Sequence, residues 1–230
     1  MLEKSGTIDT TQLLPLWYTL PEGFDPIDLS GVPEERMEAN YQGISDLYPS
    51  ATKEQLTASV LSFEVALGRM VEEGLVHISS FALGTEDGIL LTGLCQIFVV
   101  ERPPGDPNLY PRAALEAHPD EGPGVHKGIV PLPAGLAAVV VSDRTVQVPG
   151  VFFGVPTDST SAVRTASFQI AFPRIPQAVV VTLSTEVIEA EEEFLELATL
   201  VAAGVSFTAP RPVRALPEQA DAGVEPSPFG

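Results

Sequence analysis

The stretch LVHISSFALGTEDGILLTGLCQIFVV, residues 75–100, decides the fold. Two runs rich in β-branched and aromatic residues, 75–83 and 89–100, flank a turn that carries Asp87 and Gly88. This arrangement predicts a β-hairpin, because glycine adopts the positive φ that a tight turn requires. The second run is apolar at nearly every position, which is typical of a central strand covered on both faces. The first run mixes polar and apolar residues and is expected nearer an edge of the sheet.

The segments around this hairpin supply more strands. We expect strands at 136–148, 163–172 and 178–184, because these runs are apolar and are separated by proline and glycine. A short strand is expected within residues 13–24, ending in a turn at Pro21 and Gly23. The chain is therefore expected to build a mostly antiparallel sheet.

Helical patterns lie on both sides of the strand-rich region. Residues 32–74 contain two of them. In the second, one helix face is apolar at spacings of three and four and is expected to dock on the sheet: Leu56, Val60, Phe63, Leu67 and Met70 or Val71. A last helix is expected to be capped by Ser184 or Thr185 and to turn an apolar stripe toward the core. The fold class is therefore α+β, with helices packed on the sheet.

Composition divides the chain into three parts. Residues 1–12 are expected to be flexible, residues 13–208 to form one α+β domain, and residues 209–230, which are rich in proline and poor in aliphatic side chains, to be a disordered tail.

Charge and hydropathy exclude several classes of partner. The 230 residues carry 31 acidic and 12 basic side chains, a formal net charge of −19, and such a field repels phosphate backbones and anionic membranes. The apolar runs are shorter than the roughly 18 residues that a membrane-spanning helix needs. We expect no nucleic-acid or membrane partner and, since no export signal is recognisable in the first residues, a cytoplasmic location.

Reactive side chains are sparse. The chain has three histidines and one cysteine, and no phosphate-binding or catalytic motif. Cys95 lies within an apolar strand and is expected to be a buried, inert thiol. His77 and Ser79 share one strand face while Asp143 lies on another strand, so a Ser–His–Asp arrangement stays open as an alternative. We otherwise expect no catalytic residue, no metal and no cofactor.

A second acidic feature lies near the end of the folded region. Glutamates recur there at helical spacing and are expected to form a solvated face rather than a cation site: Glu186, Glu189, Glu193 and Glu196.

The segment 103–128 is the expected functional region. It is dense in proline and glycine with one helical turn near Ala113, and it is longer than a connector needs to be. It contains four residues suited to anchoring a partner, namely Leu109, Tyr110, Arg112 and Leu115. The predicted function is a non-catalytic protein-interaction or adaptor module with a protein partner. The alternatives are an apolar small molecule bound in a cavity under this segment, an unrecognised enzyme, and a surface insertion without function.

Four short stretches carry a resemblance to a known family: WYTLPEGF at 17–24, LPAG at 132–135, AVVVTLST at 178–185 and AGVSF at 203–207. In their order along the chain they resemble the Mog1/PsbP-like group, in particular actinobacterial members related to the LpqN lipoproteins. The resemblance implies an α/β/α sandwich that serves as a binding module without shared catalytic residues. The chain departs from the lipoprotein members because no signal peptide or lipid-bearing cysteine is recognisable. Its middle segment is also longer.

Overall fold

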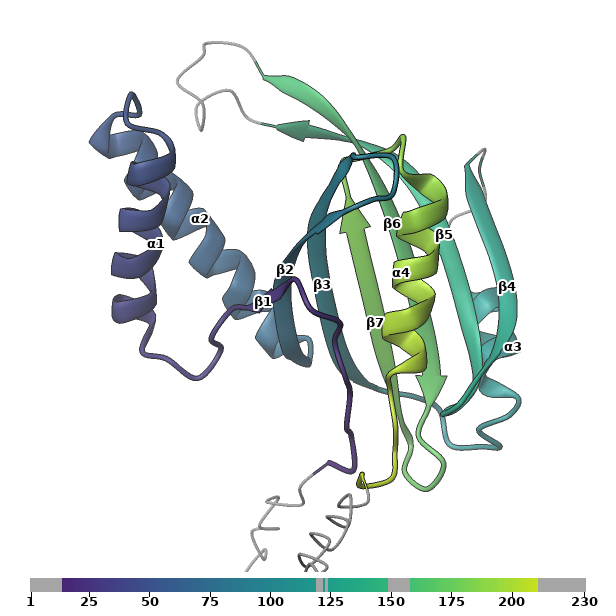
Figure 1. The fold of residues 1–230 in the computed structure, drawn as a ribbon. Coiled ribbons are helices and arrows are strands. Elements are labelled where there is room, and N and C mark those ends of the chain that lie inside the picture. Colours follow the sequence, from purple (N-terminus) through teal and green to yellow (C-terminus); the bar gives the residue numbers. More distant parts are fainter. Residues whose placement is uncertain (1–13, 119–121, 123, 149–157, 211–230) are drawn as a thin grey trace, which may run out of the picture.

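The described part of the chain forms one antiparallel sheet with helices on both faces. The structure is a computed structural model that describes residues 14–118, 122, 124–148 and 158–210. Seven strands are described, in the order β1-β2-β3-β7-β6-β5-β4 (Figure 1). Their bounds are Phe24–Pro26 (β1), Leu75–Gly84 (β2), Leu90–Glu101 (β3), Val125–Leu132 (β4), Gly135–Val148 (β5), Ser159–Ala171 (β6) and Gln177–Thr185 (β7). The α+β prediction is confirmed.

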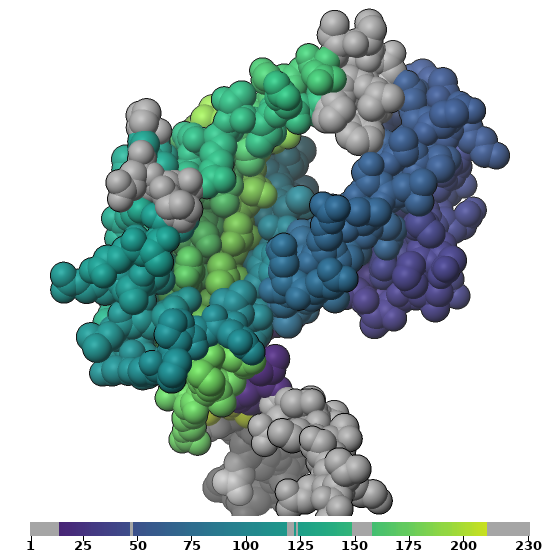
Figure 2. All heavy atoms as spheres, turned by 180° about the vertical axis from the view of Figure 1, so that it is seen from behind, coloured from purple at the N-terminus to yellow at the C-terminus, as the bar shows by residue number. Residues whose placement is uncertain are grey.

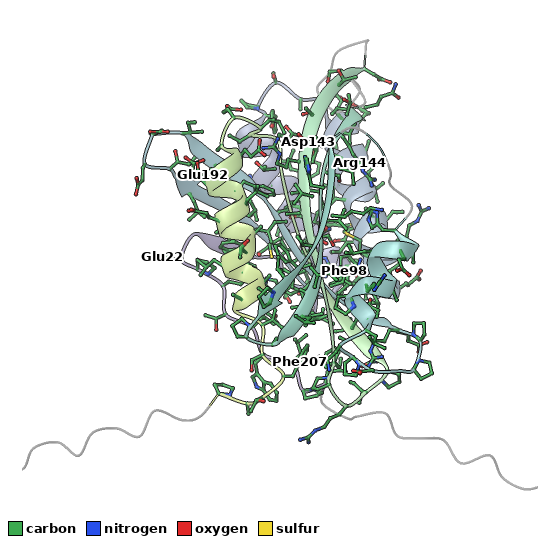
Figure 3. All side chains as sticks on the ribbon, turned by 90° about the vertical axis from the view of Figure 1, so that its right-hand side faces the viewer. Glu22, Phe98, Asp143, Arg144, Glu192 and Phe207 are labelled. Carbon is green, nitrogen blue, oxygen red and sulfur yellow. The ribbon has the colours of Figure 1, made fainter. Side chains whose placement is uncertain are left out.

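Four helices are described, at Pro33–Leu47 (α1), Lys53–Glu72 (α2), Tyr110–Ala117 (α3) and Glu191–Ala203 (α4). Figure 3 views the sheet from its side and shows α4 and α3 on opposite faces. The α1–α2 hairpin projects from the β1–β2 end of the sheet (Figure 1). No helix among the described residues is long and apolar enough to cross a membrane.

The main core lies between the sheet and α4. Ile97, Val181 and Phe168 are cross-strand neighbours on β3, β7 and β6, and each is nearly or completely buried. Phe194 and Val201 of α4 belong to the same buried cluster. Strand alternation places the intervening residues on the opposite face of the sheet. One face of the sheet therefore holds most of the buried apolar side chains.

An ion-pair network holds the first turn of α4 against the sheet. The buried Arg164 guanidinium donates from Nε and Nη2 to the two carboxylate oxygens of Asp143, at 2.7 and 2.8 Å. Its Nη1 lies 3.0 Å from Glu191 Oε2 and donates to the Ile188 carbonyl. The hydrogen bonds from Arg164 lower the pKa of Asp143. Figure 3 shows Asp143 and the next residue, Arg144, near the same end of β5.

The expected hairpin at residues 75–100 is present as β2 and β3, and Gly88 has a φ of +79° in its turn. However, β3 is not covered on both faces over its whole length. Leu94 is 40% exposed and Leu90 is 61% exposed. Both lie in the half of β3 nearest the hairpin turn.

The segment 103–128 contains the helical turn expected near Ala113, but it also enters a strand that the sequence did not predict. Residues 110–117 form α3 and residues 125–132 form β4. The proline-rich composition hid the full length of α3 and the strand β4. Pro111 lies in the first turn of α3, where its missing N–H costs nothing. Pro131 lies on the edge strand β4, where one side of the backbone needs no hydrogen-bonding partner.

Two further boundaries differ from the sequence-based expectations. Within 13–24, Trp17 forms only an isolated bridge to Ser206, and the strand β1 begins after the turn rather than before it. α4 begins at Glu191, because Thr185 belongs to β7, where its hydroxyl donates to the Thr92 carbonyl and accepts from the Val187 N–H. Glu186 and Glu189 thus lie before the helix.

The expectation that the face of α2 docks on the sheet holds only for its last turns. Leu67 packs in a small cluster with Leu75 and Ile78. The rest of α2 contacts α1 instead, and Arg36 of α1 forms a two-pronged ion pair with Glu64 of α2 at 2.6 and 2.9 Å. Residues 1–12 and most of the tail expected at 209–230 lie outside the described residues.

Candidate functional site

A pocket of about 530 Å³ lies between α3, the chain that follows β3, and strand β6. It opens on the sheet face opposite α4, the face turned to the viewer in Figure 2. Its lining comprises Glu101, Arg102, Pro103, Pro104, Gly105, Asp106, Leu109, Tyr110, Ala113, Ala114, Ala117, His118 and Gln169. Most of these side chains are small or apolar. Three of them are alanines of α3, which leave room beside the helix.

Arg102 builds the base of the pocket. Its side chain is buried, and all five of its N–H donors point at backbone carbonyl oxygens. Nε donates to Gln177, Nη1 to Pro103 and Gly105, and Nη2 to Phe172 and Ile175, at 3.1–3.4 Å. Arg102 thereby ties the segment after β3 to the β6–β7 turn. It has no donor left for a bound anion.

Tyr110 and Gln169 form the polar part of the wall. The Tyr110 hydroxyl donates to Gln169 Oε1 at 3.1 Å, and its ring centroid lies 5.9 Å from Arg102 Cζ. Burial raises the pKa of the Tyr110 phenol, which keeps it protonated and available as a donor. The Gln169 amide nitrogen donates no hydrogen bond to another described residue. It is a donor available to a molecule in the pocket.

The negative charge at the rim of the pocket restricts which ligands can enter it. Glu101 and Asp106 are exposed carboxylates in the lining, and Arg102 is saturated by backbone oxygens. A negatively charged ligand would meet two like charges at the entrance and no free cationic donor at the base. The pocket therefore suits an uncharged, largely apolar molecule that carries a hydrogen-bond acceptor.

The four residues expected to anchor a partner are distributed unequally around this pocket. Tyr110 lies in its wall, and Leu109, which is 67% exposed, lies at its rim. Arg112 points to solvent and pairs with Glu116 one turn later, at 3.1 Å. Leu115 is half-buried and is not part of the lining.

Sequence reasoning missed Arg102, Gln169 and the α3 alanines. Arg102 follows an apolar strand directly, and nothing local indicates that its partners lie up to 75 positions away. Gln169 alternates with Phe168 and Ile170, which indicates only that it lies on the other face of the strand.

Residues considered for catalysis do not converge. His77 lies on β2 and Asp143 on β5, with β3, β7 and β6 between them, so four strand spacings of about 4.8 Å separate them by roughly 19 Å. Asp143 is instead paired with Arg164. The Ser–His–Asp alternative is therefore not supported by the geometry.

The remaining reactive groups are also apart. Cys95 is completely buried, and burial raises its pKa to about 12. Over the described ranges, no group of three or more His, Cys, Asp or Glu side chains is placed to hold a metal ion.

Another hollow runs along the outer face of α4, but its lining comes from that one helix and includes three glutamates, Glu191, Glu192 and Glu196. It lacks the second wall and the converging polar groups of the α3 pocket.

Comparison with known proteins adds no relative: no protein-family model, curated protein or solved structure matches the chain. The resemblance to the Mog1/PsbP-like group stays a prediction from the sequence.

Proposed function

We propose that this protein is a non-catalytic binding protein whose α3 pocket takes an uncharged, largely apolar small molecule. The observation that carries the proposal is the pocket itself, whose volume of about 530 Å³ is within the range of small-molecule sites. Its wall combines apolar carbon with one available amide donor, which is the usual composition of such sites. The bound molecule is expected to accept a hydrogen bond from Gln169.

The test compares two dyes of similar size. Nile red is uncharged and carries a carbonyl, whereas anilinonaphthalene sulfonate is an anion. Nile red is expected to bind the full chain saturably, with at least about tenfold higher affinity than the anion, because of Glu101 and Asp106 at the rim. Native mass spectrometry of the freshly purified protein would show directly whether a small molecule accompanies it.

Two matched substitutions locate the dye. Ala113→Trp fills the pocket and is expected to abolish the binding of Nile red, whereas Ala39→Trp, at an exposed alanine of α1, is expected to leave it unchanged. Equal loss in both variants, or retention of binding in Ala113→Trp, would contradict the assignment.

A protein-interaction role for the same region is the second candidate. It is favoured by Leu109, a large apolar side chain exposed at the pocket rim. Replacing the whole segment 103–128 would remove α3 and part of β4, so point substitutions are the suitable test. Leu109→Ser is expected to weaken the binding of a protein partner that docks over the pocket, whereas Leu200→Ser, at a leucine 59% exposed on α4, serves as the matched control.

A further inference from the structure

Helix α2 presents a second apolar face that is largely exposed in the described part of the chain. Its first face, with Leu56, Val60 and Leu67, is buried. On another side, Ala58, Leu61, Val65 and Gly68 recur at spacings of three and four, the pattern of a helix-pairing seam. Leu61 is 50% and Val65 56% exposed. We call the stretch from Ala58 to Gly68 on this side the α2 seam.

The position of the hairpin makes the α2 seam accessible. The α1–α2 hairpin stands away from the sheet, with a gap between the sheet and part of α2 (Figure 2). Two helices alone cannot bury apolar residues on more than their facing sides, so a seam on another side of α2 stays in water unless a further element binds there.

Gly68 gives a second, independent indication of a partner. A glycine within a helix destabilises it by roughly 0.5–1 kcal/mol relative to alanine. Packing within the described chain does not require a glycine here, because a Cβ atom added to Gly68 would meet nothing within 4 Å. The same is true of Gly43 in α1. A glycine in an exposed seam allows the backbone of another helix to approach closely.

The charges at the ends of the seam select its occupant. Continuing the spacing by four residues at each end reaches Glu54 and Glu72, both exposed. A second copy of this chain would place these glutamates opposite glutamates in either orientation. In an antiparallel pair centred between Leu61 and Val65, Glu54 would face Glu72 of the other copy. Like charges in such positions oppose pairing.

We propose that the α2 seam binds an amphipathic helix of another protein, with an apolar stripe bounded at both ends by Lys or Arg. The two glutamates are 18 positions apart, so the basic residues of the partner should be separated by about 27 Å along its helix. The net charge of −19 favours the approach of such a cationic segment. This surface is separate from the α3 pocket.

The proposal is tested with synthetic helical peptides and the full chain. One peptide carries leucines at seam spacing and lysines at both ends, and its control has glutamates in place of the lysines. Fluorescence anisotropy is expected to show saturable binding of the lysine-ended peptide, at least about tenfold tighter than that of the control. No saturable binding, or equal binding of both peptides, would overturn the proposal.

Substitutions show whether binding occurs at the seam. Leu61→Glu is expected to lower the affinity for the lysine-ended peptide by at least about tenfold. Leu200→Glu, at a leucine 59% exposed on α4, is expected to leave that affinity unchanged. The double change Glu54→Lys and Glu72→Lys is expected to reverse the preference between the two peptides. Circular dichroism checks that each variant folds. A dimer in analytical ultracentrifugation that Leu61→Glu dissociates would instead assign the seam to a second copy and overturn the proposal.

Discussion

Arg102 offers the most direct test of how the α3 pocket is built. We consider Arg102→Met, which keeps an unbranched apolar stem of similar reach and removes all five N–H donors. The carbonyl oxygens of Pro103 and Gly105 belong to exposed residues and can turn to water. The Gln177 oxygen keeps the hydrogen bond that it accepts from the Phe172 N–H. Only the oxygens of Phe172 and Ile175 are left without a partner.

The expected loss follows from the Phe172 oxygen, because that hydrogen bond is buried whereas the one to Ile175 is only partly buried. A buried acceptor without a partner costs about 1–3 kcal/mol, so the free energy of unfolding should fall by about 1–3 kcal/mol in Arg102→Met. For a chain of this size that corresponds to a melting temperature lower by roughly 2–12 °C. Urea unfolding followed by circular dichroism measures the change. Arg102→Lys should also lose stability, because one ammonium group lacks the planar fork of five donors.

A small change in the free energy of unfolding would refute this reasoning. If the free energy of unfolding of Arg102→Met lies within about 0.5 kcal/mol of that of the parent protein, the five hydrogen bonds do not hold the segment after β3 against the β6–β7 turn. The description of the pocket base would then be wrong. Nile red binding to the same variant provides a second measurement, since displacement of the segment 103–105 should lower the affinity for the dye.

Three further predictions concern the core and the ion-pair network. Asp143→Asn should lower the free energy of unfolding by about 1 kcal/mol at neutral pH, a small figure because Asp143 is 39% exposed. The folded-state pKa of Asp143 lies below its unfolded value, so its contribution is present above the unfolded value and is lost as pH falls through the folded one. Urea titrations should therefore show the gap between parent and variant closing on acidification, and a gap independent of pH would contradict this. Cys95, with a pKa of about 12, should react with a disulfide reagent at pH of about 8 only after unfolding, and rapid labelling of the native protein would disprove its burial. Gly93→Ala should destabilise the protein strongly because the added Cβ would overlap the Ser184 carbonyl oxygen and the Phe81 ring, whereas Gly84→Ala, with open space at its Cβ, serves as the control.

Local patterns determined the elements whose stabilising residues are neighbours in the chain. The hairpin of β2 and β3 was predictable because Asp87 and Gly88 fit a tight turn and the flanking runs favour extended backbone. The start of α2 also has a local cause, since Thr52 caps it and exchanges hydrogen bonds with Gln55.

Elements and contacts that depend on residues far apart in the sequence were decided only by the tertiary structure. Edge strand β4 exists because it pairs with β5, and that pairing outweighs the poor strand propensity of Gly128 and Pro131. The α3 pocket requires Arg102 to reach carbonyls near residue 175 and Tyr110 to reach Gln169, 59 positions later. Such contacts depend on strand order and register, which alternation within a single strand does not encode. The same holds for α2, where the contacts with α1 and β2 determine which of its apolar residues are buried.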